Sequence, residues 1–233
     1  MSALHGDNVV EGPRNMAWWT GSTLLEHLES IEIAADRDAA HRRFPVQWVI
    51  RPMSEEHHDY RGYAGQVAGG EWRSGDEVIV LPSGLHTRVA AVETASGPLE
   101  VGVQGMAVVI RLEDELDIPR GEMLADPEDQ PVSARTLEAT VCWMSERPVQ
   151  PGARLGIKHT TRWARAIVDA VVSKLDVDTL EHVPADTLEL NDIARVRLRL
   201  SSPLMVDPYT VNRTTGAFIL VGEATNDTVA AGM

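Results

Sequence analysis

The chain contains very little lysine, and this scarcity excludes a phosphate-binding P-loop. Only two of its 233 residues are lysines, Lys158 and Lys174. A P-loop needs a lysine directly after a glycine, because backbone amides cradle the phosphates while the lysine reaches the β- and γ-phosphate oxygens. Ile157 precedes one lysine and Ser173 precedes the other. Neither lysine follows an asparagine, so an Asn-Lys-x-Asp guanine-binding motif is excluded as well.

Cysteine and long apolar runs are also scarce. The single cysteine, Cys142, cannot form a disulfide within the chain, and its apolar, strand-like surroundings predict a buried structural thiol. No apolar stretch approaches the roughly 20 residues that cross a bilayer. Asp7 and Glu11 interrupt the N-terminal region before any apolar run that a signal peptide would need. We therefore expect no membrane partner and a cytoplasmic location.

The charge balance is acidic, with 35 acidic against 21 basic residues and a net charge of −14. Nucleic-acid binding normally needs a basic face that displaces phosphate counterions, so we expect no nucleic-acid partner. A local basic patch is formed by Arg195, Arg197 and Arg199, which alternate with the apolar residues of 196–200. This alternation predicts the solvent face of one β-strand whose apolar side chains point inward.

One amphipathic helix is predicted near the N-terminus. Thr23 and Glu26 have the spacing of a capping box, directly after a Gly-Ser turn at 21–22. The apolar residues that follow at helical spacing are Leu24, Leu25, Leu28 and Ile31. We expect this apolar stripe to be exposed, frayed or docked on another surface. Residues 34–42 are polar and are interpreted as a linker.

After this linker the sequence predicts short strands separated by turns, as in a barrel or sandwich. The predicted strands are 44–51, 77–81, 87–92, 106–112, 136–144, 153–158, 164–172, 194–200 and 217–221. The Pro-Ser-Gly-Leu sequence at 82–85 indicates a hairpin between two of them. Residues 125–131 are rich in proline and acid, and we interpret them as the boundary between two barrels.

Two segments resemble translation-factor GTPases. Ser2, Ala3 and Leu4 resemble the short loop with which those proteins contact the guanine base, near the end of their nucleotide-binding domain. The glycine pattern of residues 62–82 resembles their second, barrel domain, where Gly70 and Gly75 bracket a tight connection that favours positive φ. The expected fold is therefore mainly β: two translation-factor-like β-barrels, preceded by a short helical remnant of the GTPase domain.

Further segments resemble one family, the large (GTPase) subunit of bacterial sulfate adenylyltransferase, also called ATP sulfurylase. They are residues 2–10, 24–29, 81–84, 112–121, 179–182, 188–198, 207–209, 212–220 and 231–233. The resemblance covers nearly the whole chain but only the part of the family that follows most of the GTPase domain. It implies three regions: the end of the GTPase domain with a linker (1–40), a barrel like translation-factor domain 2 (41–128) and a barrel like domain 3 (129–233).

The resemblance also implies a function. The complete large subunit binds GTP and magnesium and associates with a small subunit, which transfers the adenylyl group of ATP to sulfate and releases pyrophosphate. GTP hydrolysis helps to drive this uphill reaction, and some bacteria fuse an adenylylsulfate kinase to the large subunit. In this chain we expect the barrels to be a docking and relay module for the small subunit, with no catalytic residue, cofactor or metal of its own. The alternatives are a barrel pair that binds tRNA and an inactive fragment.

Three polar clusters look like sites, but their patterns favour structural roles. Residues 55–59, Glu-Glu-His-His-Asp, lie in one polar stretch, and adjacent histidines on one loop rarely converge on a metal. The acids of 113–117 share one solvated environment, whereas an acid–base pair needs unlike environments. Asp207 and Arg213 could pair near the Asn212 turn, and the pattern favours a structural role for them.

The sequence predicts that this chain alone has no measurable affinity for GTP. Ser2, Ala3 and Leu4 supply at most one wall of a guanine pocket, and the sequence contains no P-loop to hold the phosphates. Isothermal titration of the chain with GTP checks this expectation. Saturable binding would show that the loop does more than its sequence indicates.

Overall fold

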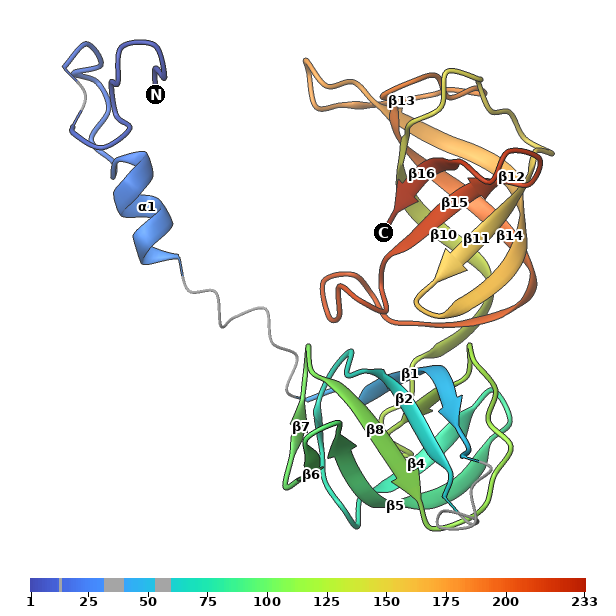
Figure 1. Cartoon of the computed structure of the whole chain (residues 1–233). Coiled ribbons are helices and arrows are strands. Elements are labelled where there is room, and N and C mark those ends of the chain that lie inside the picture. Colours follow the sequence, from blue (N-terminus) through green and yellow to red (C-terminus); the bar gives the residue numbers. More distant parts are fainter. Residues whose placement is uncertain (13, 32–39, 53–59) are drawn as a thin grey trace. The chain divides into compact units, whose positions relative to one another are not determined.

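The computed structural model describes residues 1–12, 14–31, 40–52 and 60–233 (Figure 1). The chain divides into two compact units, residues 1–37 and 38–233. The first unit contains the helix and the second contains both barrels. Of the predicted linker, residues 34–39 lie outside the described part of the chain, as does the His-containing stretch 55–59. The region boundaries at 40 and 128 stay predictions.

The first unit contains the predicted helix, α1 (Leu24–Ser30). Its capping box is confirmed: the amide of Glu26 donates to Thr23 Oγ1 at 3.2 Å, and the amide of Thr23 donates to Glu26 Oε2 at 2.8 Å. Ile31 is the C-cap, one residue past the last helical turn. No helix residue is buried, and Leu25 and Leu28 are exposed, as expected for a stripe without a partner surface within this unit.

The first barrel is a sheet in the order β4-β9-β1-β2-β8-β5-β6, and pairing of β4 with β5 closes it (Figure 1). Its strands are β1 (Arg43–Ile50), β2 (Gly62–Gln66), β4 (Glu77–Leu81), β5 (Leu85–Thr94), β6 (Gly97–Leu99), β8 (Ala107–Leu112) and β9 (Met123–Ala125). A separate ribbon pairs β3 (Glu71–Trp72) with β7 (Gly102–Val103). Phe44 and Trp72 lie in the core with their ring centroids 5.8 Å apart.

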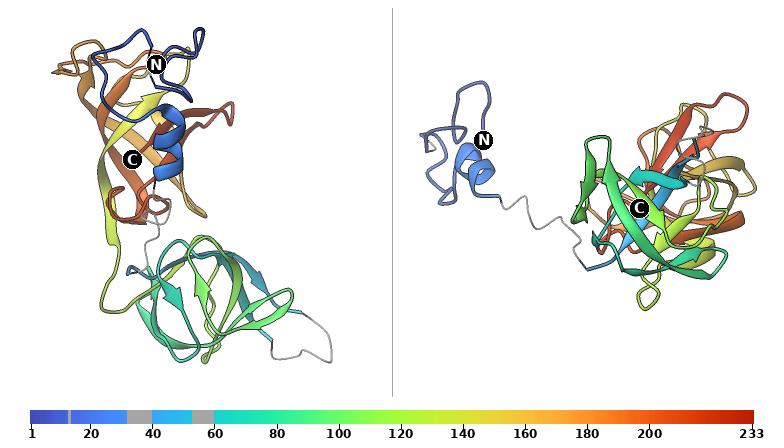
Figure 2. Two further views of the ribbon diagram at one scale, coloured as in Figure 1. Left: turned by 90° about the vertical axis from the view of Figure 1, so that its left-hand side faces the viewer. Right: turned by 60° about the horizontal axis from the view of Figure 1, so that its bottom comes forward.

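The second barrel is drawn from yellow-green to red in Figure 2. It has the order β11-β15-β16-β10-β14-β12-β13, and pairing of β11 with β12 closes it. Its strands are β10 (Val132–Trp143), β11 (Arg154–His159), β12 (Arg162–Leu175), β13 (His182–Val183), β14 (Ile193–Val206), β15 (Phe218–Gly222) and β16 (Thr228–Gly232). The predicted alternation on β14 is confirmed: Val196, Leu198 and Leu200 are buried, and the arginines between them are exposed.

Several strands were not predicted from the sequence, and their composition explains why. The missed strands are β2, β3, β6, β7, β9, β13 and β16. All of them are two to five residues long, and β2 contains two glycines, which disfavour strands when considered alone. In the fold, Gly65 of β2 has a packing role, because a Cβ atom there would lie 2.5 Å from the carbonyl oxygen of Pro45 on β1.

The glycines that were expected to adopt positive φ do so. Gly70 has φ +72° and Gly75 has φ +91°, and Gly84 of the predicted 82–85 hairpin has φ +76°. At Gly70 a side chain would also collide with the backbone, because a Cβ atom would lie 2.7 Å from the Cα of Arg42. This close approach brings the start of β1 against the loop before β3.

Candidate functional site

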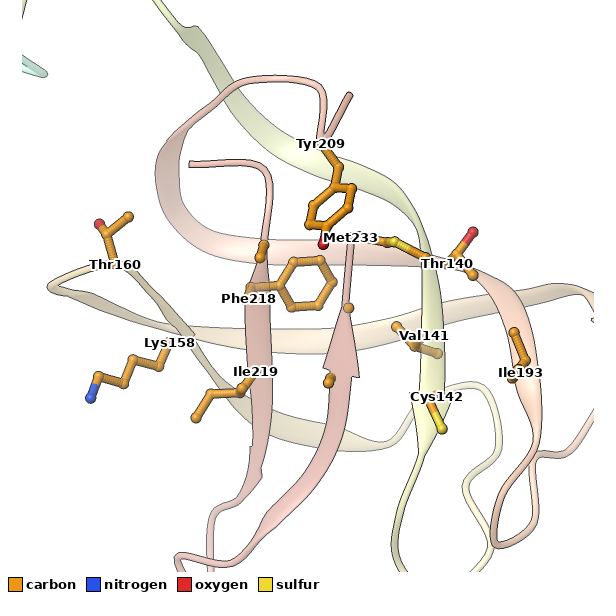
Figure 3. Close-up of a pocket in the computed structure, with 13 residues that line it drawn as sticks. Thr140, Val141, Cys142, Lys158, Thr160, Ile193, Tyr209, Phe218, Ile219 and Met233 are labelled. Carbon is orange, nitrogen blue, oxygen red and sulfur yellow. The ribbon is translucent and has the colours of Figure 1, made fainter. Parts of the chain in front are cut away.

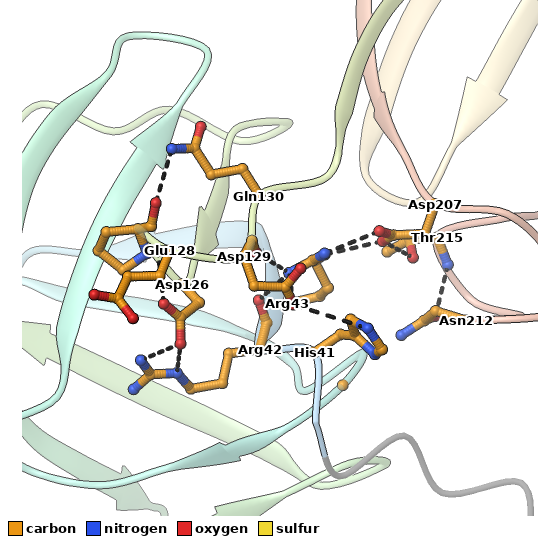
Figure 4. A network of polar contacts seen from close by, with 12 residues as sticks. His41, Arg42, Arg43, Asp126, Glu128, Asp129, Gln130, Asp207, Asn212 and Thr215 are labelled. Atoms are coloured by element: carbon orange, nitrogen blue, oxygen red, sulfur yellow. Dashed lines mark hydrogen bonds and ion pairs between the residues drawn. The ribbon is translucent and has the colours of Figure 1, made fainter.

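A buried arginine joins the two barrels. Arg43 begins β1, its side chain is 1% exposed, and its Nε and Nη2 atoms donate to the two carboxylate oxygens of Asp207, each at 2.9 Å (Figure 4). Asp207 directly follows β14 of the second barrel and is 6% exposed. The third nitrogen, Nη1, donates to the carbonyl oxygens of Asp129 at 2.7 Å and Arg42 at 3.0 Å. Two parallel bonds from one planar fork fix direction as well as distance.

The loop after β14 is held by the same carboxylate. Thr215 Oγ1 donates to Asp207 Oδ2 at 2.6 Å, and the Asn212 side chain accepts from the amides of Thr214 and Thr215. The other end of that side chain, Nδ2, donates to the carbonyl of Ala68 in the first barrel at 2.9 Å. The Asn212 turn is therefore a second bridge between the barrels.

An apolar contact accompanies these polar bridges. Met205 of β14 is buried in one cluster with Ile79, Leu81, Met123 and Ala125 on strands β4 and β9 of the first barrel. Burial of apolar side chains stabilises the contact, and it also removes water that would compete for the nearby ion pair. The joint between the barrels therefore consists of hydrogen bonds, which fix the orientation of the contacting groups, and of apolar packing, which has no preferred direction.

Arg42, next to the buried arginine, ties down the segment that connects the barrels. Its Nε donates to Asp126 Oδ2 at 3.0 Å, and its Nη1 lies 3.1 Å from Asp76 Oδ2. Burial opposes ionisation of Asp126, but the amide of Glu128 and the Arg42 guanidinium outweigh it and lower the pKa of that carboxyl. The aspartate therefore stays charged, and the ion pair persists, in mildly acidic solution.

His159 lies at the end of β11 against the same loop. Its ring is buried, and Nε2 donates to the carbonyl oxygen of Thr215 at 2.7 Å, which assigns the proton to that nitrogen. Burial lowers the pKa of His159, although the Thr215 carbonyl and the charge of Asp207 act in the opposite direction. The folded protein therefore holds this histidine neutral.

An apolar groove of about 590 Å³ lies on the outside of the second barrel (Figure 3). The rings of Tyr209 and Phe218 lie next to Met233 at its centre, and no acidic residue lines it. Cys142 also lines it and is half-buried, which corrects the prediction of a buried thiol. The reason is the strand alternation of β10, which points Val141 and Trp143 into the core and the cysteine between them outward.

The residues predicted for a guanine loop lie in the first unit. Ser2 is bridged to Asp7 by a backbone hydrogen bond of 2.9 Å, and Ala3 and Leu4 are exposed in the turn that this bridge closes. The guanine-loop interpretation of these three residues stays a prediction. No helix in the described part of the chain is long and apolar enough to cross a membrane.

The structure shows different surroundings for the polar clusters that the sequence singled out. The acids of 113–117 are exposed, and Asp114 accepts from Thr87 Oγ1 at 2.8 Å, in agreement with a charged surface turn. Asp207 does have a structural role, but its partners are Arg43 and Thr215, so the predicted pairing with Arg213 is wrong. The described residues contain no group of three His, Cys, Asp or Glu side chains arranged to hold a metal.

Sequence reasoning missed Arg43, which is central to the joint. Its partner Asp207 lies 164 positions away, and no local pattern links residues so distant. The one available signal is an arginine at the start of a strand whose other residues, except Gln47, are apolar. A buried arginine needs a paired acceptor, so such a position predicts an unknown carboxylate without identifying it.

Comparisons with known proteins find relatives of this chain among sulfate adenylyltransferase sequences. It is 49% identical over 235 residues to the bifunctional enzyme CysN/CysC of Mycobacterium tuberculosis, covering 100% of this chain and 38% of that protein. It is 42% identical to sulfate adenylyltransferase subunit 1 of Bacteroides fragilis, covering 100% of this chain and 48% of that protein. The chain thus spans less than half the length of these relatives, and the predicted resemblance is confirmed.

Two further comparisons concern the fold. Residues 136–233 match the family described as GTP-eEF1A C-terminal domain-like. The crystal structure of sup35 complexed with GMPPNP superimposes with a TM-score of 0.75 at 19% identity, covering 100% of this chain and 56% of that chain. At this identity the likeness concerns the fold alone, and it confirms the translation-factor-like architecture.

Removing one partner of the buried ion pair is expected to destabilise the protein strongly. Arg43→Met leaves the Asp207 carboxylate buried without its charge partner, which lowers the free energy of unfolding by about 3–5 kcal/mol. Arg88→Met, which breaks an exposed pair with Glu77, is the control and should cost less than about 1 kcal/mol. Urea denaturation followed by circular dichroism measures both changes. The double variant Arg43→Met with Asp207→Leu should regain part of the lost free energy of unfolding, because it removes the unpaired carboxylate. If it regains none, the loss in Arg43→Met does not come from an isolated buried charge.

The buried histidine predicts a loss of stability in acid. Its folded pKa lies below the ordinary value near 6.5, so below about pH 6.5 the unfolded chain binds a proton that the folded chain does not. The contribution of neutral His159 to the free energy of unfolding is therefore complete above that pH, and it is lost as the pH drops toward the folded pKa. His159→Gln, whose amide can still donate to Thr215, should flatten the dependence measured between about pH 7 and 5. His86→Gln, at an exposed position, should leave it unchanged.

Proposed function

We propose, from the premise that this chain is homologous over its whole length to sulfate adenylyltransferase subunit 1, that its two barrels form a docking and relay module of that enzyme. In this proposal the partner is a small subunit that transfers the adenylyl group of ATP to sulfate, giving adenylyl sulfate and pyrophosphate. The observation that carries the proposal is the 42–49% identity to such proteins across the entire chain. The activity of the whole enzyme is inferred only from these relatives.

The joint between the barrels supplies the mechanical part of the proposal. A relay needs elements that move together, and coupling between domains travels through packed, hydrogen-bonded contacts with few alternative arrangements. The Arg43–Asp207 fork, the Asn212 bridge and the Met205 cluster are three such contacts. A displacement imposed on one barrel would therefore be passed to the other. The chain carries no P-loop, so it would receive a nucleotide-dependent signal and not produce it.

Exposed aromatic residues support the docking part. Trp48 on the outer face of β1 is 67% exposed in a hollow of about 630 Å³ whose walls are largely small side chains. Tyr209 lies in the apolar groove of the second barrel. Exposed apolar patches on soluble proteins mark interaction surfaces, and tryptophan and tyrosine are enriched among the residues that contribute most to binding. Each barrel thus offers one candidate anchor.

Mixing the chain with the small subunit of sulfate adenylyltransferase tests the proposal. We expect a complex detected by size-exclusion chromatography and by calorimetry at tens of micromolar protein. Trp48→Ala or Tyr209→Ala should weaken it about tenfold or more, since loss of an interfacial aromatic anchor costs on the order of 2 kcal/mol. Arg88→Gln, which alters an exposed pair away from both hollows, is the matched control.

Absence of a complex at these concentrations would contradict the docking role. A complex that both aromatic variants leave unchanged would keep the docking role and reject these anchors. Salt-sensitive binding of tRNA, with no binding of the small subunit, would instead favour the tRNA-binding alternative, against the net charge of −14.

A further inference from the structure

We propose that the outer face of the second barrel carries a binding site for an oxyanion ligand, formed by Arg154, Arg165 and Arg199. This inference is independent of the docking role. The three arginines come from three adjacent strands, β11, β12 and β14, and line a groove of about 410 Å³ together with Ser201 and Glu223. Nothing in the homology of the chain is needed to recognise the groove.

The strand register brings the arginines together. Arg154 pairs with Ile167, and Ile167 pairs with Arg199, so these three residues form one row across the sheet. Arg165 is two positions from Ile167 on the same strand and therefore points to the same face. Since neighbouring strands lie about 4.8 Å apart, the backbones of Arg154 and Arg199 are separated by about 10 Å. Long side chains from both ends can reach a ligand placed over Ile167.

The donors of these arginines are largely unused. A guanidinium has five N–H donors, yet none of the three guanidiniums donates a hydrogen bond to a residue in the described part of the chain. Arg165 lies 3.6 Å from Glu223, and Arg199 lies 3.5 Å from Asp169, both beyond the distance of a charge-assisted hydrogen bond. Arg154 has no ion-pair partner among the described residues. By contrast, Arg195 on the same strand as Arg199 lies 2.8 Å from Glu138.

Two neighbours reinforce the site. Arg135 donates to the carbonyl oxygen of Ser201 at 3.2 Å, which anchors a fourth guanidinium beside the groove. The amide of Arg165 donates to Ser201 Oγ at 3.0 Å, so the hydroxyl is positioned at the groove wall while its own proton remains available to a ligand. Four arginines face two acids here, in a chain whose overall charge is −14. The cluster is a positive site on a negative protein.

The chemistry selects a ligand of the phosphate class with more than one charged group. Planar guanidiniums match the oxygens of a phosphate in pairs, and guanidiniums that come from backbones about 10 Å apart suit two linked oxyanion groups better than one. The half-buried Ile167 between the arginines offers an apolar surface but no polar group. Inorganic pyrophosphate is the simplest compound with these properties, and it is the probe for the test.

Calorimetric titration of the full chain with pyrophosphate in low-salt buffer is expected to give saturable binding at one site. Arg154→Gln and Arg199→Gln should each weaken the affinity about tenfold or more, because each removes charge-assisted hydrogen bonds. Arg197→Gln is the matched control: it lies on the same strand and face as Arg199, pairs with Glu138 at 3.3 Å and lies outside the groove. It should change the affinity less than twofold, with all variants keeping the wild-type circular dichroism spectrum.

Parallel titrations decide between ligand classes. Weaker binding of inorganic phosphate and sulfate than of pyrophosphate supports a site for two linked groups, whereas equal binding would overturn that assignment. No saturable binding of pyrophosphate, or equal losses in Arg197→Gln and Arg199→Gln, would overturn the site altogether. Binding of a polyglutamate peptide in place of pyrophosphate would assign the arginines to an acidic protein surface and likewise reject the proposal.

Discussion

The buried ion pair between Arg43 and Asp207 is the interaction on which the joint between the barrels depends. It is formed by residues 164 positions apart, and each side chain is almost fully removed from water. Two charges in such a place are tolerated only when every donor and acceptor is satisfied. Asp129, Arg42 and Thr215 provide the remaining partners, so the pair also organises the connecting segment and the loop after β14. Separating the barrels would expose this whole network at once.

The closed barrels determine which side chains are left for function. Pairing of β4 with β5 and of β11 with β12 closes the two sheets, so the outer faces and the loops are the main binding surfaces. Strand alternation then assigns each residue to the core or to the outside. This places Trp48 and Cys142 at hollows on the outer surface, and it places the arginines of β11, β12 and β14 on one open face. Tyr209, on the loop after β14, lines the same groove as Cys142. Docking and anion binding are thus proposed for different surfaces of one architecture.

Local features of the chain were predictable because they depend on neighbouring residues. The capping box of Thr23 and Glu26, the alternation around Leu198 and the positive φ of Gly70 all follow from short-range sterics and hydrogen bonding. A short strand such as β9 was not predictable, because it pairs with β1 and β4, which are distant from it in the sequence. The arginine groove belongs to the same class: Arg154 and Arg199 become neighbours only through their shared pairing with Ile167.

By itself, the sequence determined the class of fold, the absence of a P-loop from these 233 residues and the resemblance to the large subunit of sulfate adenylyltransferase. These are properties of composition, motif and order, which do not require knowledge of contacts. Only the tertiary structure decided that Asp207 binds Arg43 and not Arg213, that Cys142 points outward, and where the exposed arginines gather. The physical reason is that these features depend on contacts between residues that are distant in the sequence. The chain brings such residues together only when its barrels close.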